Sequence, residues 1–124
     1  MIAADTSSLV AYFNGEESAD TDRIAAALAG GELVLPPIVI TEILSDPIGS
    51  PAIDEQIRHV PALDVDNAHW ARAGRMRRLL LSQGFKARLG DALIAQSCID
   101  HDVALITRDR DFRHFVQHCG LKLG

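Results

Sequence analysis

The segment GDALIAQSCIDHDVALITRDRDF, residues 90–112, determines the fold that we predict for this chain. Residues 91–101 have the length of a helix, and residues 103–107 form an apolar run typical of a buried strand. A helix of about ten residues advances about 15 Å, and a strand of about five residues returns about 16 Å. Because these two distances nearly cancel, we expect Asp91 and Asp109 to lie at the same edge of a sheet.

The rest of the chain alternates short apolar runs with stretches of helical length. We predict further strands over residues 1–4, 33–35, 60–63 and 121–123, and helices over residues 8–13, 18–29, 38–44, 52–59, 66–83 and 109–118. Asp66 is expected to cap the longest helix, and Gly84 follows its end. Strands that alternate with helices indicate an α/β fold, with a parallel sheet covered on both faces.

The composition is that of one globular domain. Of the 124 residues, 48% are hydrophobic and 23% are charged. No apolar run approaches the ~20 residues that cross a membrane, and the N-terminus lacks the basic start of a signal peptide. The two cysteines, Cys98 and Cys119, are too few for a disulfide framework. We therefore expect a single domain over residues 1–124, a cytoplasmic location and no membrane partner.

The net charge of −5 argues against a nucleic-acid partner, but the basic residues are clustered. Half of the 12 lie between positions 72 and 88, namely Arg72, Arg75, Arg77, Arg78, Lys86 and Arg88. Three more surround Asp109, namely Arg108, Arg110 and Arg113. A local basic surface attracts phosphates even when the total charge is acidic. We predict contacts with nucleic-acid phosphates at Arg72, Arg75, Arg78, Lys86 and Arg88. The alternative is a solvated helix face whose side-chain stems pack on the core.

Four acidic residues stand at the exits of predicted strands or at the starts of helices: Asp5, Glu42, Asp91 and Asp109. Ligands of open parallel sheets bind at the carboxyl ends of the strands. Carboxylates about 5 Å apart repel each other by roughly 3 kcal/mol per pair at an effective dielectric constant of about 20. Such a site needs either raised pKa values or a cation. Oxygen ligands without nearby His or Cys favour Mg²⁺ or Mn²⁺, which would activate water for phosphodiester hydrolysis.

Each of these acids also has a purely structural interpretation. Asp5, Asp91 and Asp109 each occupy a position where an aspartate could cap the N-terminus of a helix. Glu42 stands among apolar neighbours and therefore needs a solvated face or a partner. Helix capping and metal binding are compatible roles for one side chain, so the sequence leaves both open.

The motifs around these acids resemble the PIN-domain family. MIAADTSSLVAYF, residues 1–13, resembles the opening strand, aspartate and hydroxyl residue of the family, and ITEILSDP, residues 40–47, resembles the segment with its second acid. Residues 90–112 combine the DALIA helix with the T-x-D-x-D-F motif. The resemblance covers the whole chain and is greatest to VapC-type toxins of type II toxin–antitoxin systems. It implies a PIN-like three-layer α/β/α fold with a central parallel sheet of about five strands.

The resemblance also implies roles for individual residues. The catalytic, metal-binding acids of the family fall on Asp5, Glu42, Asp91 and Asp109. Supporting polar positions fall on Ser7 and Thr107, with a supplementary acid at Asp111. The implied activity is endonucleolytic cleavage of RNA with one or two Mg²⁺ or Mn²⁺ ions, in which water attacks the phosphate. The implied partners are a second copy of the chain, as a homodimer, and a small VapB-type antitoxin that inhibits the toxin.

Three other interpretations stay open. A housekeeping PIN nuclease without an antitoxin would carry the same motifs. A receiver-like signalling domain would need a lysine at the exit of a later strand, but neither Lys86 nor Lys122 follows a predicted strand. A non-catalytic RNA-binding or interaction domain would have no need to keep every acid.

Two features outside the acids have competing interpretations. His114 and His118 are spaced like zinc ligands, but no H-E-x-x-H glutamate accompanies them, so we interpret them as structural. Trp70 and the leucine run over residues 79–81 either belong to the core or form an exposed apolar patch. Such a patch would suit a dimer or an antitoxin contact.

Overall fold

A small parallel sheet lies at the centre of the molecule. The computed structural model describes residues 1–124. Strands β1 (Ile2–Ala4), β2 (Leu33–Val34) and β3 (Ala104–Ile106) pair in parallel in the order β2-β1-β3, which makes β1 the central strand. Every strand residue except Ile2 and Ala104 is buried. This burial is typical of a parallel sheet that is covered on both faces.

The sheet is smaller than the resemblance implied. We expected about five strands, and the sheet has three. At the two other predicted strands the pairing is reduced to single bridges, between Leu35 and Ala62 and between Leu105 and Leu123. Pro36 follows the first of these bridges on one side, and Pro61 precedes it on the other. Because proline has no N–H to donate, the ladder cannot extend there.

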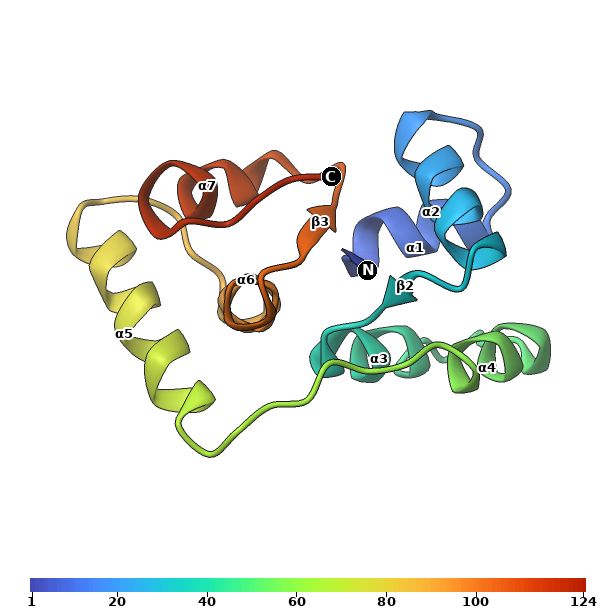
Figure 1. Ribbon diagram of the computed structural model, residues 1–124, viewed down its shortest axis with the longest axis horizontal. Coiled ribbons are helices and arrows are strands. Elements are labelled where there is room, and N and C mark those ends of the chain that lie inside the picture. The colour runs from blue at the N-terminus through green and yellow to red at the C-terminus, as the bar shows by residue number, and fades with distance from the viewer.

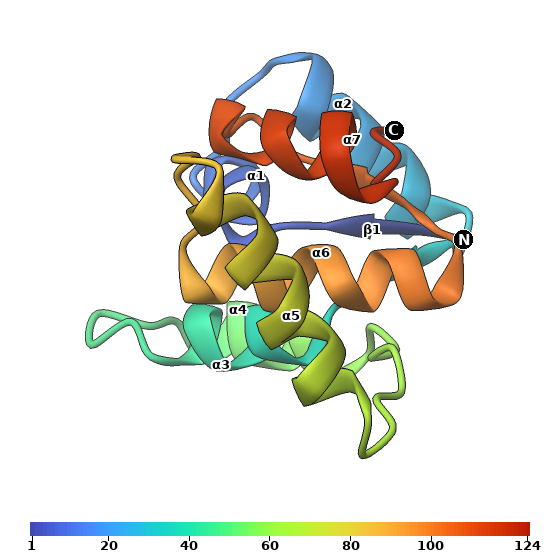
Figure 2. The same cartoon turned by 90° about the vertical axis from the view of Figure 1, so that its left-hand side faces the viewer.

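Helices surround the sheet, and every predicted helix forms. They are α1 (Thr6–Phe13), α2 (Ala19–Ala29), α3 (Pro37–Leu44), α4 (Pro51–Arg58), α5 (His69–Ser82), α6 (Leu89–His101), the 3₁₀ turn η1 (Arg110–Phe112) and α7 (Arg113–Cys119). Figures 1 and 2 show α6 and α3 on one side of β1, α2 and α7 on the other, and α5 crossing outside α6. None of the helices combines the length and the apolar surface that a membrane crossing requires.

In two helices the N-cap residue is not the aspartate that the sequence offers for that position. Helix α5 begins at His69 rather than after Asp66, whose carboxylate accepts a hydrogen bond from Arg72 instead. Helix α6 begins at Leu89, so Asp91 lies inside its first turn and is not its N-cap. The capping interpretation of Asp91 is therefore wrong, and that side chain needs another explanation.

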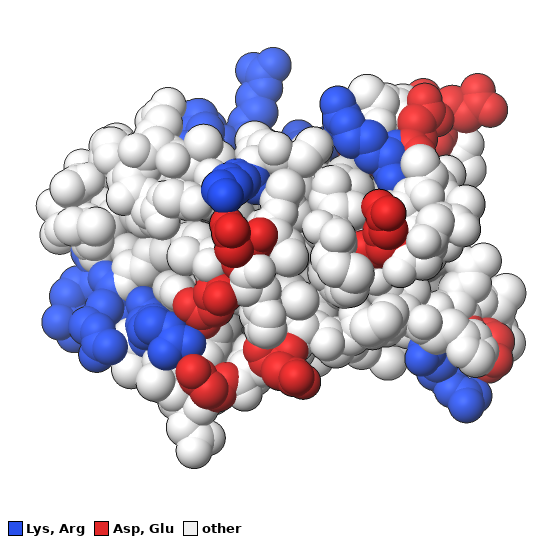
Figure 3. Space-filling view, in the orientation of Figure 1, with Lys and Arg blue, Asp and Glu red and all other residues white.

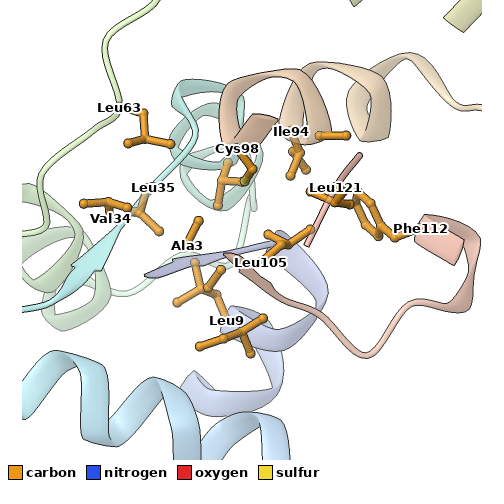
Figure 4. Packing of buried hydrophobic residues seen from close by; sticks show 14 of the residues in the cluster. Ala3, Leu9, Val34, Leu35, Leu63, Ile94, Cys98, Leu105, Phe112 and Leu121 are labelled. Atoms are coloured by element: carbon orange, nitrogen blue, oxygen red, sulfur yellow. The ribbon is translucent and has the colours of Figure 1, made fainter. Parts of the chain in front are cut away.

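One hydrophobic cluster of 23 buried residues joins the sheet to the helices. Figure 4 shows Ala3 of β1 between Leu9 of α1 and Cys98 of α6. The small side chain of Ala3 lets both helices approach the central strand closely. Burial raises the pKa of the Cys98 thiol to about 12, so the thiol stays protonated and serves as a core residue.

A substitution in this core tests how α7 is attached. The ring of Phe115 is fully buried, so we expect Phe115→Ala to lower the free energy of unfolding by about 3–5 kcal/mol, because a cavity remains. Urea titration followed by circular dichroism measures the change. The control Ile48→Ala alters a side chain that is 88% exposed and should change stability by less than ~0.5 kcal/mol. Equal effects of both substitutions would contradict the observed packing.

Candidate functional site

The carboxyl ends of the strands and the N-terminus of α6 meet at one edge of the molecule. Strand β1 runs into Asp5 and α1, and β3 runs into Thr107 and Asp109. Figure 2 shows β1 leading from the marked N-terminus toward α1, with the first turn of α6 at the same end. The acids that follow the strands are therefore brought together, as the lengths of the helix and the strand predicted.

Asp5 is the most enclosed of these acids, with only 3% of its surface exposed. Its carboxylate accepts hydrogen bonds from Ser7 Oγ at 2.8 Å, the Ser8 N–H at 3.0 Å and Thr107 Oγ1 at 2.6 Å. Burial raises the pKa of this carboxyl, and the bonds from Thr107 and Ser8 oppose that rise. Asp5 also caps α1, so its structural role is real. The Thr107 bond ties the end of β3 to the end of β1.

Asp91 has a buried oxygen without a partner. Its Oδ2 atom accepts no hydrogen bond. Burial and then the negative charge of Asp109 raise the pKa of this carboxyl to about 6. A buried acceptor left without a partner costs about 1–3 kcal/mol, and more when it is charged. A cation bound to Oδ2 would remove that cost.

Asp91 belongs to a group of three acids that converge at this edge of the sheet. Asp91, Asp109 and Asp111 each offer a carboxylate oxygen, and these atoms lie within 4.8 Å of one another. The turn η1 brings Asp109 and Asp111 together, because the Asp111 N–H donates to Asp109 Oδ1 at 2.9 Å. The Asp109 N–H in turn donates to Thr107 Oγ1. Asp111, which the resemblance implied only as a supplementary acid, thus belongs to the closest group.

Glu42 lies at the border of this group. Its carboxylate is exposed and accepts a hydrogen bond from Thr6 Oγ1 at 2.9 Å. A Cβ atom at Gly90, one residue before Asp91, would lie 3.8 Å from Glu42 Oε2. Glu42 therefore faces the first turn of α6 from α3, beside the three converging acids rather than among them.

The chemistry of this donor set fits a hard divalent cation. The donors are carboxylate oxygens, with hydroxyl groups behind them and no His or Cys among them. The unpaired Asp91 Oδ2 offers a ligand atom that the protein itself does not satisfy. Mg²⁺ and Mn²⁺ are the cations that this arrangement suits.

Asp20 is a residue of the site that the sequence analysis missed. Its buried carboxylate accepts hydrogen bonds from Ser8 Oγ at 2.9 Å and from Arg108 Nε at 2.8 Å. Ser8 also donates to Asp5, and Arg108 directly precedes Asp109. The bond from Arg108 holds the pKa of Asp20 well below its usual range, so Asp20 stays ionised. Asp20 thus fixes the two strand exits to each other, although in the sequence it looks like an ordinary helix-surface acid.

Three of the six basic residues between positions 72 and 88 form ion pairs, at two separate places. Lys86 Nζ lies 3.0 Å and Arg88 Nη2 3.7 Å from Asp111 Oδ2. Arg72 pairs instead with Asp66 and Asp100. Figure 3 shows the opposite face of the molecule, at which the strands begin. On that face acidic side chains run down the centre beside basic ones. The basic groups next to the candidate site are therefore Lys86 and Arg88, whereas Arg72 is already neutralised.

Two comparisons with known proteins agree with this geometry. A family model described as the PIN domain matches residues 2–116. The fold is similar to a chain in the crystal structure of VapBC2 from Rickettsia felis bound to a DNA fragment from their promoter, with a TM-score of 0.74 and 18% sequence identity over 100% of this chain and 98% of that chain. At this identity the likeness is one of fold. No curated protein sequence matches the chain. The family match excludes the receiver-like alternative.

The unpaired carboxyl of Asp91 predicts how stability depends on pH. Its pKa is about 6 in the folded chain against 3.8 for the free group, so ionisation destabilises the fold as pH rises between these values. We expect Asp91→Asn to stabilise the metal-free protein by about 1–2 kcal/mol at neutral pH, with the gain lost below about pH 4. Urea titration in EDTA measures this difference. Asp102→Asn, at an exposed residue, is the control and should show no such gain.

Proposed function

The chain belongs to the PIN-domain family of nucleases, and from that premise we propose that it is a Mg²⁺- or Mn²⁺-dependent endoribonuclease, the toxin of a VapBC-type pair. The observation that carries the proposal is the convergence of Asp91, Asp109 and Asp111, one of which has a buried oxygen without a protein partner. In this proposal Asp5 and Glu42 complete the set of catalytic acids. The alternative of a non-catalytic domain would leave that unpaired oxygen unexplained.

The proposed mechanism assigns a task to each residue of the site. One or two divalent cations held by the acids would polarise water and neutralise charge on the scissile phosphate. Thr107 and Ser7 hold the Asp5 carboxylate in place by donating hydrogen bonds to it. Attack by water rather than by the RNA 2′-hydroxyl leaves 5′-phosphate and 3′-hydroxyl ends.

The proposed RNA path begins at Lys86 and Arg88. Both side chains are more than half exposed and lie beside Asp111. We also include the exposed Arg78 and Arg75 of α5 in the proposed path. Such residues contact phosphates without reading the bases, and they make binding sensitive to salt. Arg72 is left out of the path because two carboxylates already neutralise it.

The proposed partners are a small antitoxin and a second copy of the chain. A pocket of about 210 Å³ adjoins Glu42 and is lined by apolar residues that include Val10, Phe13 and Ile53. We propose an antitoxin partner because the similar fold comes from a VapBC complex, and we propose this pocket as its contact because the pocket adjoins Glu42. On α5, Leu80 is buried, whereas Trp70 is 58% exposed and would suit a homodimer contact. The proposed site of action is the cytoplasm.

Cleavage assays test the catalytic assignment. The purified chain should cut RNA with Mg²⁺ or Mn²⁺ and not in EDTA. We expect Asp5→Asn and Asp91→Asn to lower the cleavage rate at least about 100-fold, because each removes a proposed metal ligand. Asp102→Asn is the matched control, since Asn tolerates the left-handed backbone of that residue and the variant should cleave normally. Wild-type rates in Asp91→Asn would refute the assignment.

Growth assays test the toxin role separately. Expression of the chain in bacteria should arrest growth, and Asp5→Asn should remove the arrest. Co-expression of the adjacent small reading frame should relieve it, because the antitoxin would cover the site. Metal-dependent cleavage without any arrest would identify a housekeeping nuclease instead.

A further inference from the structure

The loop between α5 and α6 is attached to the protein at two points. The Phe85 ring stacks on the imidazoles of His114 and His118 in α7, with ring centroids 4.6 and 4.7 Å apart. Ala87 is buried, and its carbonyl accepts a hydrogen bond from Arg77 Nε at 2.8 Å. The single residue between these two anchors is therefore held at a defined place beside the candidate site.

That residue is Lys86, and its ammonium group contacts one of the converging acids. Lys86 Nζ lies 3.0 Å from Asp111 Oδ2. The contact holds the pKa of Asp111 below its usual range, so this carboxylate stays ionised. Asp111 also belongs to the group whose oxygens lie within 4.8 Å of one another. The Asp111 carboxylate, which pairs with Lys86, is thus also one of the proposed ligands of a bound cation.

We propose that the Lys86 ammonium group competes with the divalent cation for Asp111. Lys86 neutralises Asp111 until the cation binds, and its side chain then moves to contact an RNA phosphate. The inference rests on the function proposed above and deepens it. A divalent ion attracts the three carboxylates more strongly than a single ammonium does. The Lys86 side chain is 53% exposed and flexible, so it can leave Asp111 without disturbing the core.

The exchange couples the metal to the RNA. Cation binding frees an ammonium group beside the site, and that group can then bind a phosphate. By linkage, RNA must raise the affinity for the cation by the same factor as the cation raises the affinity for RNA. Arg88 is farther from Asp111, at 3.7 Å, and would remain as a fixed positive charge.

The chain contains an internal control for this proposal. Its only other lysine, Lys122, also forms an ion pair with an aspartate, at 2.7 Å from Asp102 Oδ1. That pair is exposed and involves none of the converging acids. Substitution of either lysine removes one charge and one surface ion pair, but only Lys86→Met changes the site.

Measurement of metal affinity in the absence of RNA tests the competition. We expect Lys86→Met to lower the Mn²⁺ dissociation constant, measured by calorimetry, by about two- to fivefold. This factor corresponds to the interaction free energy of a partly exposed ion pair. Lys122→Met should leave it unchanged. An equal or weaker affinity in Lys86→Met than in Lys122→Met would overturn the proposal. Failure of the wild-type protein to bind Mn²⁺ at all would overturn the proposed function itself, and this inference with it.

Magnetic resonance of the lysine side chains follows the displacement directly. With two lysines in the chain, the two variants assign both side-chain signals. On addition of Mg²⁺, the Lys86 signal should move toward the position of a free lysine, while the Lys122 signal stays in place. Asp91→Asn should prevent this movement. A Lys86 signal that stays fixed while Mg²⁺ saturates the protein would refute the displacement.

Discussion

Repulsion among carboxylates gathered at one end of a three-stranded sheet is the constraint on which the site depends. Different partners stabilise the different carboxylates. Asp5 accepts three kinds of donor, Asp111 pairs with Lys86, and Asp20 behind them pairs with Arg108. Asp91 has a buried oxygen that nothing in the protein satisfies. A positive charge at that oxygen would therefore remove the cost of the unsatisfied acceptor.

The fold holds these charges in place with very little sheet. The strands are two or three residues long, so the pairing of the backbone alone positions the acids weakly. Side-chain hydrogen bonds supply the remaining rigidity, because Thr107 joins β3 to Asp5, and Asp20 joins α1 to the segment after β3. Polar contacts behind the acids thus do what longer strands do in larger sheets.

The distribution of basic residues reconciles an acidic protein with a proposed RNA substrate. The net charge is −5, yet Lys86 and Arg88 lie directly beside the converging acids. Arg72 and Arg108, which belong to the same basic clusters in the sequence, are neutralised by carboxylates elsewhere. A phosphate would therefore meet positive charge directly beside the site, and salt would weaken that attraction.

The sequence alone determined the alternation of helices and strands, the positions of the acids after the strands and the resemblance to the family. These features follow from local periodicity and from distances along the chain. Only the tertiary structure decided the rest. Two predicted strands became single bridges, with prolines limiting the ladder at one of them. Asp91 fell inside a helix rather than at its cap, and Asp111 joined the acids through a 3₁₀ turn. Lys86 and Arg72 look equivalent in the sequence and differ because their partners come from distant segments, which no local pattern specifies.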